Sequence, residues 1–359
     1  PPPAPPRPPP AAAPAPRIAY AVTVTKDPGE NAVGFLDGAA VLAHSIRQAH
    51  ATSAYGPSAL VAFVSPVITL KTRKSLAAIG FQSLEKQLPI DPAKMDEGDL
   101  REKWMKDPTK GGCCGAWELL KLYAWTLTEY ERVVHVDMDC MLLQPIDEIF
   151  RIDAGMVYTA DYNMMGANQR KNGLTPAVQG GFIVARPSLK VYDAIVAVMQ
   201  KGHWGGKYGS GWEGTGVGHW WGGNTIQGVL PYFFGRHAPE HLDPAAFANP
   251  TDIKGIEVDR CVYDNMIDKA VVDPLPPVGC SASRETPSAD VKFVHFTVCQ
   301  KPWSCNPNRD PNDENKICMG FHQKWFELRR EFEASRGMPT VEKACFKGYH
   351  PMDFTGIVR

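Results

Sequence analysis

The sequence lacks several features that would place it in a common class of protein. Its 38 Lys and Arg residues nearly balance its 39 Asp and Glu residues, and the net charge is −1. Neither a basic surface for nucleic acid nor an acidic tail is therefore expected. No apolar run reaches about 18 residues, so no segment is expected to span a membrane. No G-x-x-x-x-G-K-[ST] loop is present, which makes a phosphoryl-transfer enzyme a remote alternative.

The cysteines lack the spacing of a metal site. None of the nine cysteines forms a C-x-x-C pair, which argues against structural zinc. Disulfides in a secretory lumen are the favoured interpretation, and free buried thiols are the alternative. The odd count leaves at least one thiol unpaired, and the absence of an N-x-[ST] sequon weakens the secretory interpretation. We expect at least one disulfide among the last four cysteines, namely Cys299, Cys305, Cys318 and Cys345.

The N-terminal segment has little that could form a core. Residues 1–17 contain ten prolines and five alanines, a composition that favours polyproline II and a stiff spacer. A disordered tail is the alternative. The chain begins with proline rather than methionine, which indicates a processed or truncated form and leaves a lost signal or anchor open. We expect one domain over residues 18–337 and a C-terminal tail over 338–359.

Short β-rich runs alternate with helical patterns through much of the chain. The predicted strands are "IAYAVTV", "ALVAFVS", the run ending at Val136, "GMVYTADY", "GGFIVARP" and "VKFVHF". The predicted helices are "FLDGAAVLAHSIRQAH", "TLKTRKSLAAIG", "AWELLKLYAWTLTEY", "SLKVYDAIVAVMQKG" and "FHQKWFELRREFEASRG". This alternation indicates right-handed βαβ crossovers and an α/β fold with a mainly parallel sheet flanked by helices. Ligands in such sheets bind at the carboxyl ends of the strands.

Two carboxylates stand at the end of a run that is otherwise suited to burial, "VVHVDMDCMLLQPIDEIF" from Val133 to Phe150. Unpaired buried carboxylates are costly, so Asp137 and Asp139 need a positive partner or a place in a cleft. Side chains two apart on a strand point the same way, which lets both acids face one cation while Met138 turns into the core. Hard oxygen ligands suit Mg²⁺ or Mn²⁺. His295, at the end of another predicted strand, could add a nitrogen ligand and favour Mn²⁺. Taken alone, the D-x-D motif is weak: Asp139 could instead cap a turn, and the histidine could be structural.

Several ordered motifs together resemble glycosyltransferase family 8, which includes glycogenin and galactinol synthase. They are "IAYAVTVTKD", "LLKLYAWTLTEYERVVHVDMDCMLLQPIDEIF", "VQGGFIVARPS", "TIQGVLPYFF" and "HFTVCQKPW". The resemblance spans roughly residues 18–303. It implies a GT-A fold and a retaining transfer from a nucleotide sugar, usually a UDP-sugar. It also implies that Asp137, Asp139 and His295 bind Mn²⁺ against the diphosphate, with Mg²⁺ as the alternative.

The resemblance assigns further residues to the donor site. Lys301 would add positive charge beside the diphosphate, and Lys121 matches a family lysine near the donor sugar. Without the match, Lys121 would be an exposed helix lysine. The other positions that it assigns are Thr25 at the uridine, Gln179 and Gly180 in donor binding, and Asp161 and Gln227 as catalytic candidates.

The sequence also departs from the family at several positions. Ile226 stands where many members have aspartate, Gln179 where asparagine is common and Val298 where glycine is common. Ile226 accepts neither a proton nor a hydrogen bond, so Gln227, Asn224 and Glu213 are the remaining polar candidates. A covalent mechanism needs a carboxylate beneath the anomeric carbon. We therefore favour a front-face reaction, in which the leaving phosphate guides the acceptor hydroxyl.

A stretch rich in glycine and tryptophan precedes "TIQG". Residues 201–223 contain ten glycines and four tryptophans. Glycine allows close approach of the backbone to a ligand, and flat aromatic rings cover the faces of sugars. We expect Trp212, Trp220 and Trp221 to face a sugar ring, in a loop that becomes ordered when ligand binds. The alternative is a surface loop with its tryptophans in the core.

The favoured interpretation is a metal-dependent retaining glycosyltransferase in the secretory lumen, in the Golgi. Its partners would be a UDP-sugar donor and a glycan, glycoprotein or polysaccharide acceptor, with membrane contact only through an anchor absent from this chain. A cytoplasmic self-glucosylating primer of the glycogenin type is the close alternative. An inactive glycan-binding relative is the alternative from another class, but such a protein needs no clamp for a diphosphate.

Overall fold

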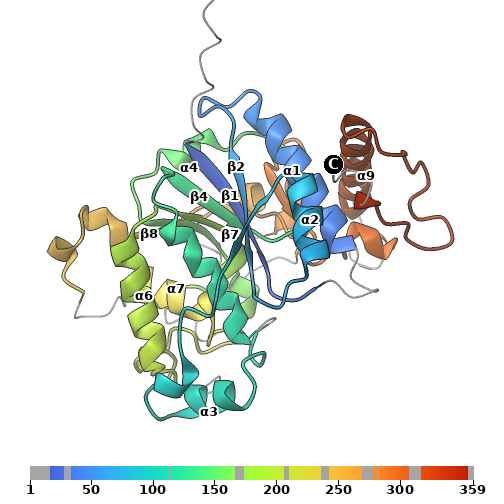
Figure 1. Cartoon of the computed structure of the whole chain (residues 1–359). Helices are drawn as coiled ribbons and strands as arrows, with labels where there is room; N and C mark the ends of the chain where they lie inside the picture. Colours follow the sequence, from blue (N-terminus) through green and yellow to red (C-terminus); the bar gives the residue numbers. More distant parts are fainter. Residues whose placement is uncertain are drawn as a thin grey trace, which may run out of the picture.

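A seven-stranded sheet lies at the centre of the structure (Figure 1), with the strand order β3-β2-β1-β4-β7-β6-β8. This computed structural model describes residues 17–27, 34–112, 115–165, 174–205, 210–235, 242–268, 278–280, 282–306 and 317–354. The strands of the central sheet are β1 Ile18–Val24, β2 Ala59–Val64, β3 Gln82–Glu85, β4 Arg132–Val136, β6 Met156–Ala160, β7 Val178–Ala185 and β8 Gly255–Glu257. A two-stranded sheet consists of β5 Cys140–Leu142 and β9 Phe293–His295.

The expected α/β fold with a mainly parallel sheet is confirmed. Strands β3, β2, β1 and β4 run parallel, as do β6 and β8, while β7 runs antiparallel to both of its neighbours. In the β4–β7 register, Val136 lies opposite Phe182. Gly180 and Gly181, just before Phe182, therefore lie beside the carboxyl end of β4, where the two aspartates follow.

Helices cover both faces of this sheet. One face carries α1 Gly34–His50, α2 Leu70–Ile79 and α9 Ile317–Ser335. The other carries α3 Asp99–Lys106, the 3₁₀ helix η3 Gly115–Thr126, α6 Leu189–Lys201 and α7 Ile226–Phe234. The remaining helical turns are η2 Pro92–Lys94, α4 Asp147–Phe150, η4 Tyr162–Met164, η5 Pro244–Ala246, η6 Pro250–Ile253, α8 Arg260–Tyr263, η7 Ser283–Glu285 and η8 Pro302–Ser304.

The continuous apolar runs in the sequence follow from this two-sided cover. Along β1, Tyr20 and Val22 pack into the core beneath α1, whereas Ala19 and Ala21 pack into the core beneath η3. Both faces of a central parallel strand are buried, so alternation between apolar and polar residues is not required. The predicted helix "AWELLKLYAWTLTEY" is present, but it is wound as 3₁₀ and ends at Thr126.

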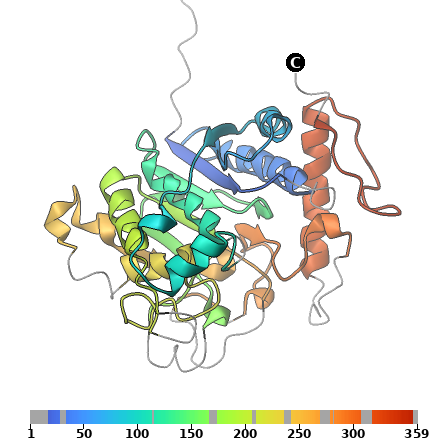
Figure 2. The same ribbon diagram turned by 60° about the horizontal axis from the view of Figure 1, so that its bottom comes forward.

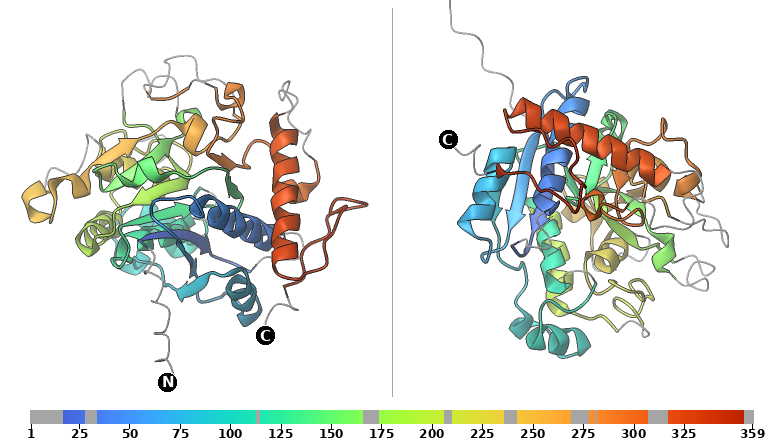
Figure 3. Two further views of the ribbon diagram at one scale, coloured as in Figure 1. Left: turned by 90° about the horizontal axis from the view of Figure 1, so that it is seen from above. Right: turned by 90° about the vertical axis from the view of Figure 1, so that its right-hand side faces the viewer.

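The residues expected to form a C-terminal tail are part of the domain as far as Phe354. Figures 2 and 3 show α9 lying beside α1, and the chain beyond α9 returns along it. Met352 and Phe354 are buried in the same core as α1, and the backbone N–H of Met352 donates to Asp37 at 3.0 Å. Residues 1–16 of the expected spacer lie outside the described residues.

Three disulfides join cysteines in the described ranges, and two of them confirm the prediction for the last four cysteines. Cys299 pairs with Cys318 in α9, and Cys305 pairs with Cys345; in each pair the Cα atoms are 5.4 Å apart. The third bridge, Cys261–Cys280, was not expected. Among the described cysteines only Cys140 is free. The bridges are compatible with a secretory lumen. None of the helices in the described ranges has the length and apolar character needed to cross a bilayer.

Candidate functional site

The two aspartates and the histidine meet because the short second sheet begins where β4 ends. Asp137 directly follows β4, and Asp139 directly precedes β5. Strand β5 pairs antiparallel with β9 so that Cys140 lies opposite His295. The backbone N–H of Phe296 also donates to the carbonyl of Asp139 at 2.9 Å. Backbone hydrogen bonds therefore hold Asp139 beside His295, although the two residues are distant in the sequence.

Each carboxylate directs one oxygen to a lysine and the other towards His295. Asp137 Oδ1 accepts from Lys121 Nζ at 2.9 Å, and its Oδ2 lies 4.0 Å from His295 Nε2. Asp139 Oδ2 accepts from Lys301, and its Oδ1 lies 3.6 Å from His295 Nε2. These carboxylate–imidazole distances are too long for hydrogen bonds. Ligand atoms around Mg²⁺ or Mn²⁺ lie about 3 Å apart when adjacent and about 4 Å apart when opposite, and both distances to His295 Nε2 are of this size. Asp137 is nevertheless not in the group of described residues whose potential ligand atoms all lie within 4.8 Å of one another.

The donor chemistry fits a hard divalent cation better than a soft one. Asp139, Cys140 and His295 place potential ligand atoms within 4.8 Å of one another. Burial raises the pKa of the Cys140 thiol well above its ordinary value, and the thiol points at the carbonyl of Gly181, 3.9 Å away. A protonated thiol is a poor ligand. Of the available groups, the carboxylates and the imidazole are therefore the better candidate donors, and such donors suit a hard divalent cation such as Mn²⁺ or Mg²⁺.

The lysines and the imidazole balance the buried carboxylates. Burial alone would raise the pKa of Asp139, but His295 and Lys301 hold it below its ordinary value. Burial alone would likewise lower the pKa of His295, but Asp139, Asp264 and Asp137 raise it to about 9. At neutral pH the imidazole therefore carries a proton that a divalent cation must displace.

Mn²⁺ binding at pH 7.5 is expected to release about one proton. His295 is protonated below its pKa of about 9, whereas a metal ligand must be the neutral imidazole. The apparent Mn²⁺ affinity should therefore fall about tenfold for each pH unit below that value. Calorimetry in two buffers of different ionisation enthalpy measures the released proton. A binding heat that is independent of the buffer would contradict the prediction.

Lys121 is a buried cation rather than an exposed helix lysine. It extends from η3 and also donates to the carbonyl of Gly180 at 3.0 Å. Its Nζ lies 3.5 Å from a carboxylate oxygen of Glu118, which is buried as well. A Cβ on Gly180 would lie 3.2 Å from Lys121 Nζ and 3.1 Å from Ile226 Cδ1. Ile226, where the family commonly has an acid, thus presents an apolar side chain at the edge of the site.

Gly181→Ala is expected to weaken Mn²⁺ binding and to lower stability by about 1–3 kcal/mol, as overpacking typically does. A Cβ at Gly181 would lie 2.4 Å from His295 Cε1, so the ring would have to move. Gly320→Ala in α9 is the matched control. Its Cβ meets no atom within 4 Å, and helix propensity should raise its stability by up to about 1 kcal/mol. Metal titration and chemical denaturation measure both effects. An unchanged Mn²⁺ affinity in Gly181→Ala would contradict the expectation.

The other residues assigned by resemblance make the following contacts, with residues other than Asp137, Asp139 and His295. Gln179 accepts from the backbone N–H of Gly181 at 2.7 Å. Asp161 caps η4 by accepting from the N–H of Asn163, and burial raises its pKa to about 6. Thr25 lies just past β1, where its carbonyl accepts from Ser65 at 2.8 Å.

Gln227 lies on α7. Its side-chain amide nitrogen is 3.6 Å from Met164 Sδ.

Two close neighbours of the cluster were not found from the sequence. Glu118 stands three residues before Lys121 on the same helix, a spacing that could have indicated the pair. Asp264 lies beside His295 but is far from it in the sequence, so no short spacing indicates that the two residues meet.

The expectation for the tryptophans was wrong for two of the three. Trp212 and Trp220 are buried in the core beneath η3, α6 and α7, whereas Trp221 is 51% exposed. The indole of Trp212 donates to the carbonyl of Gly223 at 2.7 Å. Gly211, Gly214, Gly216, Gly218 and Gly222 all have positive φ. The glycines therefore allow the tight turns that turn the large rings inward.

Comparison with known proteins agrees with the resemblance. Rabbit (Oryctolagus cuniculus) glycogenin-1 is 25% identical over 287 residues, which cover 80% of this chain and 65% of the relative. Human (Homo sapiens) glycogenin-1 is 26% identical over 298 residues, covering 83% and 65%. The chain thus spans slightly less than two thirds of the length of these relatives. No family model matches the chain.

The chain is also similar to a solved structure of the galactosyltransferase LgtC in complex with donor and acceptor sugar analogues. That likeness has a TM-score of 0.49 at 12% identity and covers 91% of this chain and 98% of the other. The sequence similarity to the glycogenins and the mainly parallel α/β sheet support a glycosyltransferase family 8-like assignment with a GT-A fold.

Proposed function

We propose that this protein is a metal-dependent retaining glycosyltransferase that transfers a sugar from a UDP-sugar to a glycan or glycoprotein acceptor. The observation that carries the proposal is that Asp137, Asp139 and His295 converge at the end of β4. In each carboxylate, the oxygen that does not face His295 contacts a lysine. Binding of a neutral glycan alone does not require these charged groups. Binding of a nucleoside diphosphate through a divalent cation requires both the carboxylates that bind the cation and the lysines that neutralise the phosphates.

Asp137, Asp139 and His295 would hold the cation, Mn²⁺ in preference to Mg²⁺. The cation would supply positive charge where the departing diphosphate gains negative charge. Lys301 forms an ion pair with Asp139 and also donates to the carbonyl of Phe296 at 2.6 Å. It would place a second positive charge beside the phosphates. Lys121 would do the same from η3, near the donor sugar. Gln179, Gly180 and Thr25 would complete the donor site.

A front-face reaction is the mechanism that these residues favour. Ile226 occupies the position where many family members have an acid, and its side chain packs against the Gly180 backbone. The acids Asp137 and Asp139 are engaged by lysines, and Asp161 is bound to the turn that it caps. The leaving phosphate would then accept the proton of the acceptor hydroxyl, while the protein orients both substrates and excludes water. Gln227 and Asp161 would contact the sugar or its acceptor.

Slow hydrolysis of the donor tests this function without knowledge of the acceptor. The protein is incubated with Mn²⁺ and a panel of UDP-sugars, and released UDP is measured. We expect UDP release from one or a few sugars, with loss of the signal when EDTA replaces Mn²⁺. A folded protein that binds no UDP and releases none with any donor would overturn the proposal and favour the inactive glycan-binding alternative.

Two further alternatives concern the acceptor and the compartment. The similarity to the glycogenins favours a self-glucosylating primer, whereas the three disulfides favour an enzyme of the secretory lumen, in the Golgi. Mass spectrometry after incubation with the active donor separates the two, because a primer would carry added hexose on a tyrosine. We favour the lumenal enzyme because paired cysteines persist in an oxidising compartment.

A further inference from the structure

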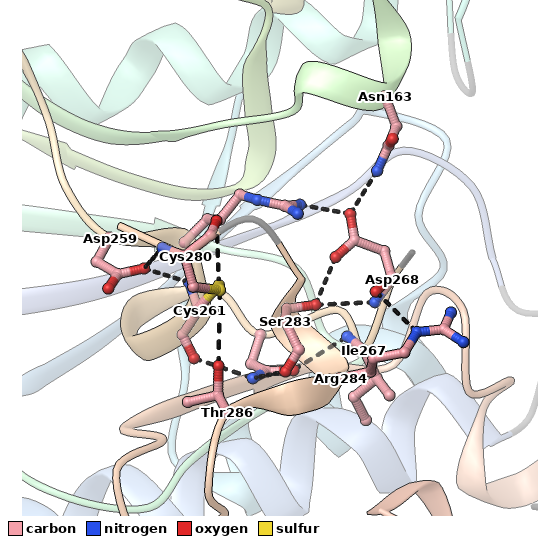
Figure 4. Close-up of a disulfide and its surroundings, with 11 residues drawn as sticks. Asn163, Asp259, Cys261, Ile267, Asp268, Cys280, Ser283, Arg284 and Thr286 are labelled. Atoms are coloured by element: carbon pink, nitrogen blue, oxygen red, sulfur yellow. Dashed lines mark hydrogen bonds and ion pairs between the residues drawn. A yellow bond between two sulfur atoms is a disulfide. The ribbon is translucent and has the colours of Figure 1, made fainter. Parts of the chain in front are cut away.

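A loop closed by the Cys261–Cys280 disulfide borders the candidate site. We call it the 261–280 loop; its described residues are 261–268 and 278–280. The two cysteines are 19 residues apart in the sequence, with Cα atoms 6.0 Å apart. Asp259 holds both ends, because its Oδ1 accepts from the N–H of Cys261 at 2.8 Å and that of Cys280 at 3.4 Å (Figure 4).

Asp264 in this loop faces the histidine of the site. Its Oδ1 lies 3.2 Å from His295 Nδ1, and its Oδ2 accepts from Thr159 Oγ1 at 2.9 Å. The Asp264 side chain is fully buried. Among the described residues, its Oδ1 and His295 Nδ1 have no hydrogen-bond partner, because their 3.2 Å approach lacks hydrogen-bond geometry, so each is the only polar atom facing the other. Asp264 is the C-cap residue of α8, and its backbone N–H donates to the carbonyl of Arg260, the first residue of that helix, at 3.1 Å. With a proton on Nδ1 directed at Asp264, Nε2 is directed at Asp137 and Asp139.

The loop backbone is joined to the strand that carries His295. The N–H of His295 donates to the carbonyl of Asn265 at 3.0 Å, and the N–H of Asn265 donates to the carbonyl of Phe293 at 2.9 Å. The side chain of Asn265 donates to the carbonyls of Cys261 and Ser283, both at 2.9 Å. Asn265 and the residues beside it therefore cannot shift without moving β9.

The far end of the described loop is anchored by a buried carboxylate. Asp268 accepts from Asn163 Nδ2 at 2.6 Å and also from Arg260 and Ser283 (Figure 4). Asn163 belongs to the turn that Asp161 caps. Between these anchors, Met266 Sδ lies 3.1 Å from the amide nitrogen of Gln179. One closed loop thus contacts His295, Gln179 and the turn of Asp161.

We propose that Asp264 is a positioning residue for His295, and that the Cys261–Cys280 bridge holds Asp264 in place. The proposal rests on the proposed function, in which His295 binds a divalent cation through Nε2. Metal-ligating histidines commonly donate their other ring N–H to a carboxylate, which fixes ring orientation and raises ligand basicity. The 261–280 loop supplies that carboxylate here.

The first test compares Mn²⁺ affinity in four folded proteins: wild type, Asp264→Ala, Asp264→Asn and Asp252→Ala. Asp264→Ala should lose about 10- to 100-fold in affinity, the usual range for such outer partners. Asp264→Asn should recover most of the loss, because its amide oxygen still accepts the ring N–H. Asp252 is the control, because it is also buried but pairs with Arg186 at the opposite end of β6. Its replacement should leave Mn²⁺ affinity unchanged.

The second test needs neither metal nor activity. His295 is buried, so a ring N–H bound to Asp264 should give a downfield proton signal that exchanges slowly with water. The signal should be present in metal-free wild type and in Asp264→Asn, and absent from Asp264→Ala and from His295→Gln. A role limited to folding would not separate the asparagine and alanine variants in this way.

The third test removes the bridge and leaves Asp264 in place, so the proposal stays testable if Asp264→Ala does not fold. Cys261→Ser with Cys280→Ser should weaken Mn²⁺ binding several-fold and broaden or abolish the ring N–H signal. Wild type that binds Mn²⁺ no more tightly than Asp264→Ala, or a serine pair with unchanged affinity and signal, overturns this inference alone. Wild type that binds no Mn²⁺ overturns the proposed function and this inference with it.

Discussion

Asp139→Asn is expected to abolish Mn²⁺-dependent UDP binding while the protein remains folded. The side chain is buried, directs one oxygen at His295 and accepts from Lys301 with the other. Asparagine keeps the shape but removes the charge that a divalent cation requires. Even outer partners of metal ligands contribute about 10- to 100-fold in affinity. Loss of a direct ligand should therefore cost more than about 100-fold.

Calorimetric titration of UDP, with and without Mn²⁺, measures this effect. Asp153→Asn is a matched control, because that acid also pairs with a basic residue, Arg186, but its side chain is 64% exposed at the far end of β6. The control should bind UDP as wild type does. Unchanged Mn²⁺-dependent affinity in a folded Asp139→Asn protein would remove this residue from the metal site.

Trp212→Ala should destabilise the protein by about 3–5 kcal/mol, the usual cost of truncating a buried aromatic side chain. Trp212 is fully buried, and its indole N–H donates to the carbonyl of Gly223. Truncation would therefore leave a cavity and an unpaired carbonyl. A loss of this size is a large part of the typical stability of a domain. Chemical denaturation followed by circular dichroism measures it.

Trp221→Ala is the matched comparison from the same stretch. Its ring is 51% exposed, so its truncation should change stability by no more than about 0.5 kcal/mol. Trp221 can still face a sugar, and we expect its loss to weaken transfer more than UDP binding. If Trp212→Ala is as stable as wild type, the stretch is not part of the core. If Trp221→Ala transfers normally, that ring is not an acceptor contact.

The sequence by itself determined the fold class and indicated the principal residues of the candidate site. Apolar runs with helical patterns between them are sufficient to predict a mainly parallel sheet, because each run must be covered on both faces. The paired acids after Val136 were identified because a buried strand cannot end in two unpaired charges. His295 and Lys301 were found through the family-like motif "HFTVCQKPW", whose spacing is local and readable.

Other features could be decided only by the tertiary structure. Whether a tryptophan in a glycine-rich stretch faces solvent or the core depends on the backbone turns around it, and composition cannot separate Trp212 from Trp221. The buried state of Lys121 depends on Gly180, which β7 places beside it only by running antiparallel to β4. Asp264 meets His295 because α8 ends next to β9, and a disulfide closes the loop that follows. Such contacts join residues far apart in the chain, whereas local patterns record only the requirements of neighbouring residues.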